Sequence, residues 1–269
     1  MSPVVVPTMS HLVPVPGGAV VEVLVDRSRQ PPAGPAVVLL PSSLRDATDL
    51  GELACLLAAA GCPVLRPQPR GMGRSSAPPD TLSLHLLADD VARAIDVLAD
   101  GPALVAGHAF GHFVARVLDL DHPQRVRGVA VLAAAARQFP PGLVDALDIA
   151  ADANQPVAAR LASLRHAFFA PGNDASVWLS GWHPHLRDVY RRAGAIPAKD
   201  RWWPVSHAPI LDLQAALDPW RPPVSRNELK DQLGDKVTVR VIPHASHALV
   251  TEQAAAVAAA IVEWAGTLP

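Results

Sequence analysis

The sequence predicts an α/β fold in which a mostly parallel sheet is flanked by helices. Two observations lead to this class. From residue 36 onward, short apolar runs alternate with longer segments of helical periodicity, as in sheets whose strands are buried on both faces. The chain has 269 residues, 50% of them hydrophobic and 18% charged, so it can bury one large core.

The predicted elements follow in a regular order. Two strands, Leu12–Val15 and Ala19–Val25, flank Gly17-Gly18, and this pattern predicts an antiparallel hairpin. The later segments are predicted as strands Ala36–Leu40, Cys62–Arg66, Ala103–Ala106, Val126–Ala133, Pro209–Gln214 and Val237–Ile242, and as helices Leu50–Ala60, Leu84–Ala99, Phe110–Asp121 and Leu249–Trp264. Eight strands result, and their alternation with helices indicates a parallel sheet covered on both faces.

The alternation stops between residues 136 and 206. This stretch has helical patterns and holds most of the aromatic residues of the chain: Phe139, Phe168, Phe169, Trp178, Trp182, Tyr190, Trp202 and Trp203. Because apolar pockets use such side chains, we expect a helical lid over residues 136–205, inserted into a core formed by residues 1–135 and 206–269. The alternative is that these aromatics pack only the small core of the insertion.

The segment Gly107-His108-Ala109-Phe110-Gly111 has the form of a nucleophile elbow, G-x-S-x-G, without its central serine. An elbow is a sharp strand-to-helix turn, and its two glycines allow the backbone to expose the middle side chain above the sheet. Ala109 stands where the nucleophile would be and has no atom that can attack a substrate. We expect Ala109 to adopt unusual backbone angles close to His247.

An acid and a histidine follow the elbow in the order Ala109, Asp218, His247, each after a separate predicted strand. Four further segments have the form of known motifs. Leu39–Ser43 lies at the end of a strand, and Arg70–Ser75 has the form R-G-x-G-x-S. Gln214–Asp218 is similar to the motif Q-G-x-x-D, and Pro243–His247 is similar to P-G-x-x-H. On these motifs the chain resembles the lid-bearing ester hydrolases of the α/β-hydrolase fold superfamily. The segments Trp202-Trp203 and Asp218–Pro223 resemble bacterial monoester hydrolases of the monoalkyl phthalate type.

The resemblance implies a role for each candidate residue. His247 would be the base and Asp218 the acid that orients it, while position 109 would carry the nucleophile. The backbone N–H groups of Phe110 and of Ser43 or Leu44 would bind the oxyanion. Substrate contacts would come from the remaining candidates, which are Ser42, Ser43 and Trp203. Arg45 could pair with an anionic substrate or be an ordinary surface arginine.

Two explanations of Ala109 stay open. The retained acid and base favour an inactivated variant of a working hydrolase, which is our preferred interpretation. Other departures from the family pattern, at Pro41, Gln68 and His112, favour a native serine-free site. In that case the His–Asp pair would act as a general base on water or on a substrate C–H bond, or the protein would only bind a ligand.

Composition limits the partners. A formal net charge of −2 gives no basic surface for nucleic acid, and no apolar stretch reaches the ~18 residues of a membrane span. Cys55 and Cys62 show neither disulfide nor zinc spacing, and Met1–Pro7 does not have the pattern of a signal peptide. We therefore expect a cytoplasmic hydrolase without metal or cofactor, acting on an ester or similar acyl bond of a small, fairly apolar substrate. The sequence leaves the oligomeric state open.

Overall fold

The computed structural model describes residues 8–27 and 32–268, so Met1–Pro7 lies outside the described residues. Its central feature is a single eight-stranded sheet with the order β1-β2-β4-β3-β5-β6-β7-β8. The strands are β1 (Thr8–Val15), β2 (Ala19–Asp26), β3 (Val37–Leu40), β4 (Val64–Pro67), β5 (Ala103–His108), β6 (Val126–Leu132), β7 (Ile210–Ala215) and β8 (Val237–Ile242). In this order all neighbours from β4 to β8 pair in parallel, and β2 is antiparallel to both of its neighbours, β1 and β4. The predicted mostly parallel, eight-stranded sheet is confirmed.

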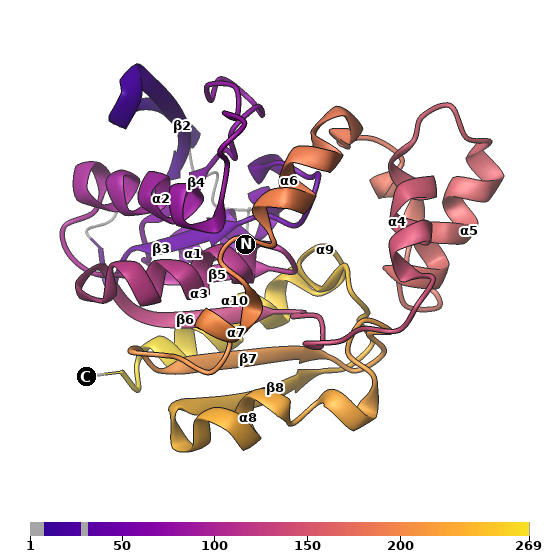
Figure 1. Cartoon of the computed structure of the whole chain (residues 1–269). Coiled ribbons are helices and arrows are strands. Elements are labelled where there is room, and N and C mark those ends of the chain that lie inside the picture. Colours follow the sequence, from indigo (N-terminus) through magenta and orange to yellow (C-terminus); the bar gives the residue numbers. More distant parts are fainter. Residues whose placement is uncertain (1–7, 28–31, 269) are drawn as a thin grey trace.

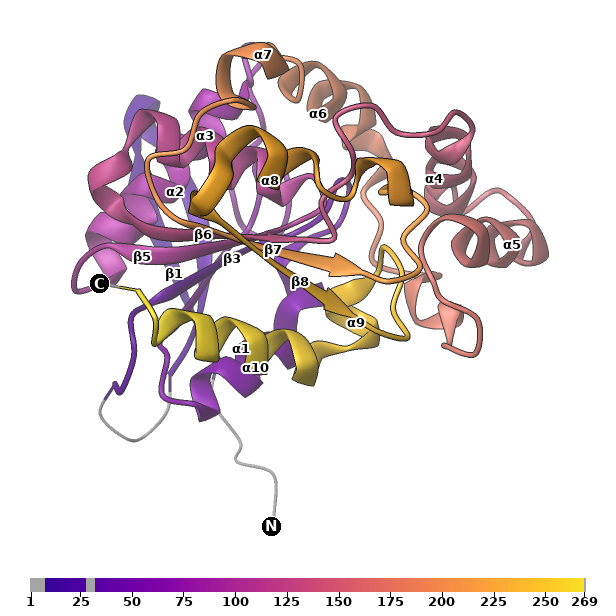
Figure 2. The ribbon, with the colours of Figure 1, turned by 90° about the horizontal axis from the view of Figure 1, so that it is seen from below.

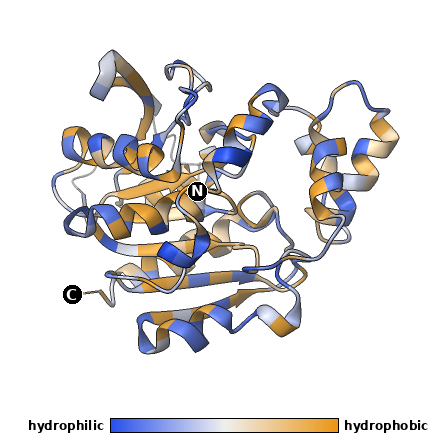
Figure 3. Ribbon diagram, in the orientation of Figure 1, coloured by the Kyte–Doolittle hydropathy of each residue, from blue (hydrophilic) through white to orange (hydrophobic). Residues whose placement is uncertain are grey.

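Helices cover both faces of the sheet (Figure 1). On one face lie α2 (Leu84–Leu98), α3 (Gly111–Asp121) and α8 (Glu228–Leu233), and on the other lie α1 (Gly51–Ala59) and α10 (Ala254–Ala265), as Figure 2 shows. The alternation of side chains along β3 explains why both faces need cover. Val38 and Leu40 enter one core, whereas Val37 and Leu39 enter the other. Apolar colour accordingly concentrates on the strands in Figure 3.

The last predicted helix differs from the structure in one respect. Leu249–Trp264 is divided into α9 (Leu249–Glu252) and α10, because Gln253 leaves the helical region with φ −139° and ψ 44°. The Glu252 carboxylate accepts hydrogen bonds from the backbone N–H of Ser246, at 2.6 Å, and from that of Ala170, also at 2.6 Å. The short α9 therefore fastens the loop before it, which carries His247.

Between β6 and β7 the chain forms further helices instead of another strand. These are α4 (Leu143–Ala151), α5 (Val157–Ala167), α6 (Arg187–Ala193) and α7 (Lys199–Trp202). In Figure 1, α4 and α5 lie beyond the end of the sheet to which the arrows of β7 and β8 point. The insertion thus stands at the carboxyl ends of the parallel strands, where α/β proteins form their sites.

Candidate active site

Ala109 lies at the turn between β5 and α3 in a left-handed conformation, with φ 46°. Such an angle is uncommon for a residue with a side chain, and it costs of order 1–2 kcal/mol. The neighbouring glycines explain why the turn can form. A Cβ on Gly107 would overlap the backbone of Gly111, and one on Gly111 would overlap the carbonyl of Leu40. The strained turn expected from the glycine spacing is therefore present.

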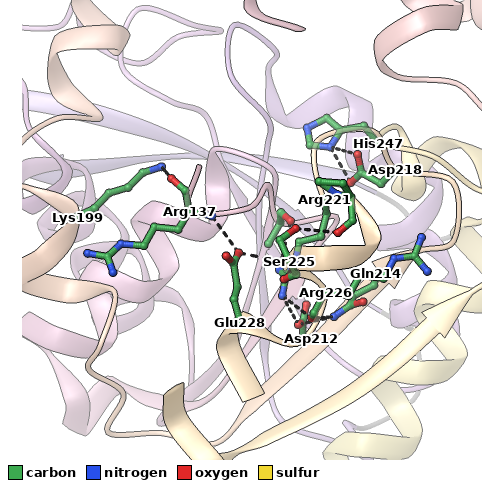
Figure 4. A network of polar contacts seen from close by, with 12 residues as sticks. Arg137, Lys199, Asp212, Gln214, Asp218, Arg221, Ser225, Arg226, Glu228 and His247 are labelled. Atoms are coloured by element: carbon green, nitrogen blue, oxygen red, sulfur yellow. Dashed lines mark hydrogen bonds and ion pairs between the residues drawn. The ribbon is translucent and has the colours of Figure 1, made fainter. Parts of the chain in front are cut away.

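His247 and Asp218 form a buried pair at the same end of the sheet. Asp218 follows β7 and His247 follows β8. The Nδ1 of His247 lies 3.0 Å from Oδ2 and 3.2 Å from Oδ1 of Asp218 (Figure 4). Since an ionised carboxylate only accepts hydrogen bonds, we assign the proton to Nδ1, which leaves Nε2 as the acceptor. In the described residues no hydrogen bond occupies Nε2.

One tryptophan holds this imidazole in place. Trp220 stacks on His247, with ring centroids 5.0 Å apart and an interplanar angle of 25°. Its backbone N–H also donates to Asp218 Oδ1 at 2.9 Å, and its indole N–H donates to the carbonyl of Ala167 at 2.7 Å. Trp220 therefore fixes both members of the pair at once. In the sequence Trp220 is only one member of the segment Asp218–Pro223, and no local pattern distinguishes it.

Two further histidines support the turn as neutral groups. His108 Nε2 donates to the backbone carbonyl of His247 at 2.7 Å, and His112 Nδ1 donates to the carbonyl of Ala109 at 2.6 Å. Complete burial lowers the pKa of His108 from 6.5 to about 3, and burial also holds the pKa of His112 well below its ordinary value. His112 is thus a structural part of the turn.

The expected oxyanion groups meet beside Ala109. Ser42, Ser43, Leu44 and Phe110 line the same cavity as Ala109 and His247. Leu44 has φ 58°, so the loop after β3 makes a sharp turn there. Among the described residues, the backbone N–H groups of Phe110 and Ser43 have no hydrogen-bond partner. This leaves them available to a negatively charged oxygen.

A cavity of about 560 Å³ opens above these groups. Residues of the core form its floor, and residues of the insertion form its other walls. Its apolar side chains include Phe113, Phe139, Val144, Leu147, Phe168 and Trp220, its charged ones are Asp148, Arg187, Arg191 and Lys199, and the imidazole of His247 also lines it. The charged residues of the insertion were missed at the sequence level, because their spacing matches that of ordinary exposed helix faces.

Two expectations differ from the structure. Trp203 is 1% exposed and does not line the cavity; it packs behind the elbow against Trp202 and His112, with ring centroids 5.5 and 6.1 Å away. Arg45 is neither a surface arginine nor part of the cavity wall. It is buried, pairs with Asp49, and lies between other tryptophans. Long-range packing, which has no local sequence signal, determines both positions.

Arg45 joins the loop after β3 to the insertion. Its guanidinium carbon lies 4.6 Å from the ring centroid of Trp178 and 4.7 Å from that of Trp182. Its Nη1 donates to the carbonyl of Ser180 at 2.6 Å, and its backbone bridges to Trp182. Cation–π contacts and hydrogen bonds therefore link the two chain segments that border the site.

Over residues 8–27 and 32–268, no group of three or more His, Cys, Asp or Glu side chains is arranged to hold a metal ion. No helix within the same residues is both long enough and apolar enough to cross a bilayer.

The sequence is similar to those of known proteins. The sequence model of the family described as "Alpha/beta hydrolase family" matches residues 37–260. The "Putative carbamate hydrolase RutD" of Variovorax paradoxus (strain S110) is 31% identical in an alignment 249 residues long, which covers 83% of this chain and 89% of that protein.

Solved structures share the fold. An esterase (EaEST) from Exiguobacterium antarcticum superimposes with a TM-score of 0.78 at 17% identity, covering 96% of this chain and 100% of that one. Est816, described as an N-acyl homoserine lactone degrading enzyme, gives a TM-score of 0.76 at 22% identity, covering 94% and 100%. At these identities the two structures support the fold alone.

Proposed function

The chain belongs to the α/β-hydrolase family, and on that premise we propose that its cavity is a site for hydrolysing an ester or similar acyl bond of a small, fairly apolar substrate. One observation carries the proposal. A hydrogen-bonded His247–Asp218 pair, the strained turn at Ala109 and the N–H of Phe110 all border one cavity. Acyl transfer needs these parts in one place, and a hydroxyl at position 109 is the missing one.

The chemistry that we propose uses each part in turn. A serine hydroxyl at position 109 would lose its proton to His247 Nε2 and attack the acyl carbon. Asp218 would stabilise the imidazolium, while the N–H groups of Phe110 and of Ser43 or Leu44 would bind the oxyanion. The imidazolium would then protonate the leaving group, and water would release the acyl group by the same steps. The protein with Ala109 retains every group of this scheme except the attacking oxygen.

The serine-free alternative assigns the attack to water. His247 Nε2 would remove a proton from a water molecule, and the methyl group of Ala109 would leave more room for it than a serine would. His112, one of the departures from the family pattern, supports this alternative, because its Nδ1 donates to the carbonyl of Ala109 and so stabilises a turn that has alanine at its centre. A protein that binds a ligand without turnover is the third candidate.

We further propose that the insertion acts as a lid. Val144, Leu147 and Asp148 on α4, with Arg187 and Tyr190 on α6, line the cavity that the core closes from below. Such a cover would exclude water from the reacting groups. The carbamate hydrolase relatives extend the proposed substrates to carbamates and related acyl compounds. The cytoplasm is the proposed location, in line with two cysteines among 269 residues.

The test compares the protein with Ala109 against Ala109→Ser and Ala109→Ser/His247→Ala on a panel of small esters and carbamates. Loss of the nucleophile of a serine triad costs roughly 10⁶-fold in turnover, so Ala109→Ser should raise the rate by several orders of magnitude. The double variant should return to the low rate. If Ala109→Ser is no faster on any compound, hydrolysis by a serine at this position is refuted. Turnover by the Ala109 protein that requires His247 would favour the water mechanism.

A further inference from the structure

The charged side chains on the insertion side of the cavity are unequally paired. Arg187 and Arg191 both face Asp148: Arg187 forms a close ion pair with it, and the Nη2 of Arg191 lies 3.7 Å from its Oδ2. Lys199 lines the same cavity from α7. Among the described residues, Lys199 differs from the two arginines of the cavity in having no carboxylate oxygen within 4.0 Å of its ammonium nitrogen.

Aromatic rings and one carbonyl surround the ammonium group of Lys199. Its Nζ donates to the backbone carbonyl of Arg137 at 3.0 Å (Figure 4). It lies 5.1 Å from the ring centroid of Phe113, 5.6 Å from that of Phe139 and 5.7 Å from that of Trp203. An ammonium has three N–H donors, and one of them is used here. Two donors therefore remain beside a cavity whose walls are mainly apolar.

Among the described residues, this charge forms no ion pair with a carboxylate. Burial lowers the pKa of Lys199, which means that its charged form is poorly solvated. Glu228 is near enough to oppose that shift, but its Oε1 accepts a hydrogen bond from the backbone N–H of Arg137 at 2.9 Å. A partly desolvated cation with free donors gains from an anion that enters the cavity, since pairing offsets the loss of solvation.

We propose that Lys199 binds a carboxylate of the substrate, so that the cavity selects small esters that carry a second, ionised carboxyl group. The inference rests on the proposed function, because it takes the acyl bond to be held at Ala109 and His247. The apolar Phe110 and Phe113 line the cavity with Lys199 and would contact the hydrocarbon part of such a molecule. Lys199 is then a specificity-determining residue of the insertion.

The experiment measures binding by the unsubstituted protein, using two ligands of similar length: monoethyl adipate, which carries a carboxylate, and ethyl hexanoate, which is neutral. Titration calorimetry should show that the Ala109 protein binds monoethyl adipate about tenfold or more tighter, as expected for a hydrogen bond to a charged group. In Lys199→Gln the two affinities should agree within about twofold, and Lys199→Arg should keep most of the preference. The matched control is Lys230→Gln, since Lys230 is 42% exposed and pairs with Asp235; it should leave the preference unchanged.

Equal affinity of the two ligands for the unsubstituted protein would overturn the proposal, whatever happens to the variants. A preference that survives in Lys199→Gln would also overturn it, because the anion would then bind elsewhere. Turnover in the Ala109→Ser background separates this inference from the proposed function. Hydrolysis of both esters at equal rates would refute the carboxylate site and support the proposed hydrolase. A Lys199-dependent binding preference without any hydrolysis would support the carboxylate site and refute the proposed hydrolase.

Discussion

Two arginine–aspartate pairs, one in the core and one in the insertion, differ in their surroundings. Arg221 and Asp212 belong to the core: Nη2 lies 2.9 Å from Oδ2, and the two side chains are 2% and 0% exposed. Arg187 and Asp148 belong to the insertion and are 41% and 18% exposed. The core pair has lost nearly all its water, whereas the insertion pair keeps much of it.

The core pair also fixes the loop that carries Asp218. Arg221 donates to the carbonyls of Ala134, at 3.3 Å, and Arg226, at 3.0 Å, and so ties this loop to β7 and to the chain after β6. The insertion pair joins only α4 to α6. From this difference we expect substitutions at the core pair to disturb the reacting groups and the fold more than substitutions at the insertion pair do.

The largest expected effect concerns Asp218. In the Ala109→Ser background, Asp218→Asn should lower kcat by about 10⁴-fold, because the amide favours the wrong tautomer of His247; this magnitude is taken from serine proteases. Arg187→Gln in the same background should change kcat by less than about tenfold, since a residual charge on the wall does not act on the proton transfers. Steady-state kinetics on one ester measures both. Equal losses in the two variants would contradict the division between core and insertion.

The next effect concerns stability. Arg221→Met should lower the free energy of unfolding by about 3–5 kcal/mol, because it leaves the Asp212 carboxylate buried without its cation. Burial already raises the pKa of Asp212 in the presence of Arg221. Urea unfolding gives the value. Adding Asp212→Leu should recover part of the loss; no recovery would mean that the hydrogen bonds of Arg221 to the backbone carbonyls matter more than the charge.

A pH dependence should come from the buried histidines of the core. The pKa of His108 is about 3 in the folded protein and 6.5 ordinarily, so between these values the unfolded chain binds the extra proton. Stability from this group is complete above pH 6.5 and falls as the pH is lowered, by up to about 1.4 kcal/mol for each unit.

The measurement compares two proteins by how steeply the free energy of unfolding changes with pH. Unfolding free energies at several pH values between 6.5 and 4 should fall less steeply in His108→Gln than in the unsubstituted protein. His112→Gln should behave in the same way, because the pKa of His112 is also lowered. Parallel slopes would show that His108 is not kept neutral by burial in the folded state.

The smallest effect is expected in the insertion. Arg187→Met should change the free energy of unfolding by about 0–1 kcal/mol, as is usual for ion pairs with solvent access. It is the counterpart of Arg221→Met, and both proteins can be unfolded under the same conditions. If Arg187→Met lowered the free energy of unfolding as much as Arg221→Met does, the expected difference would be wrong, because the insertion pair would then stabilise the fold as much as the core pair.

Much of the core was predictable from local patterns. Buried strands such as β3 and β5 are continuous apolar runs, and such runs identify themselves without knowledge of their neighbours. Gly107 and Gly111 predicted the turn because the absence of Cβ atoms is a local property. Asp218 and His247 were identified by resemblance, because their order after separate strands is that of the α/β-hydrolases; the strands before them end at one edge of the parallel sheet.

The insertion was less predictable. Its helical character and its aromatic content could be read from the sequence, yet Trp203 lies behind α3 and Phe168 lies against His247, with ring centroids 5.8 Å apart. Helical periodicity states which residues share a face but not what that face meets. The sequence likewise could not separate Lys199 from exposed lysines or Arg45 from exposed arginines.

The sequence by itself determined the fold class, the strained turn at Ala109 and the chain order of Asp218 and His247, because hydrophobic periodicity and glycine positions act over a few residues. Only the tertiary structure decided which side chains close the cavity: Trp220 over His247, Arg45 between Trp178 and Trp182, and Lys199 at the wall. Each of these contacts joins segments far apart in the chain. Their energies depend on burial and on partners that no local pattern specifies.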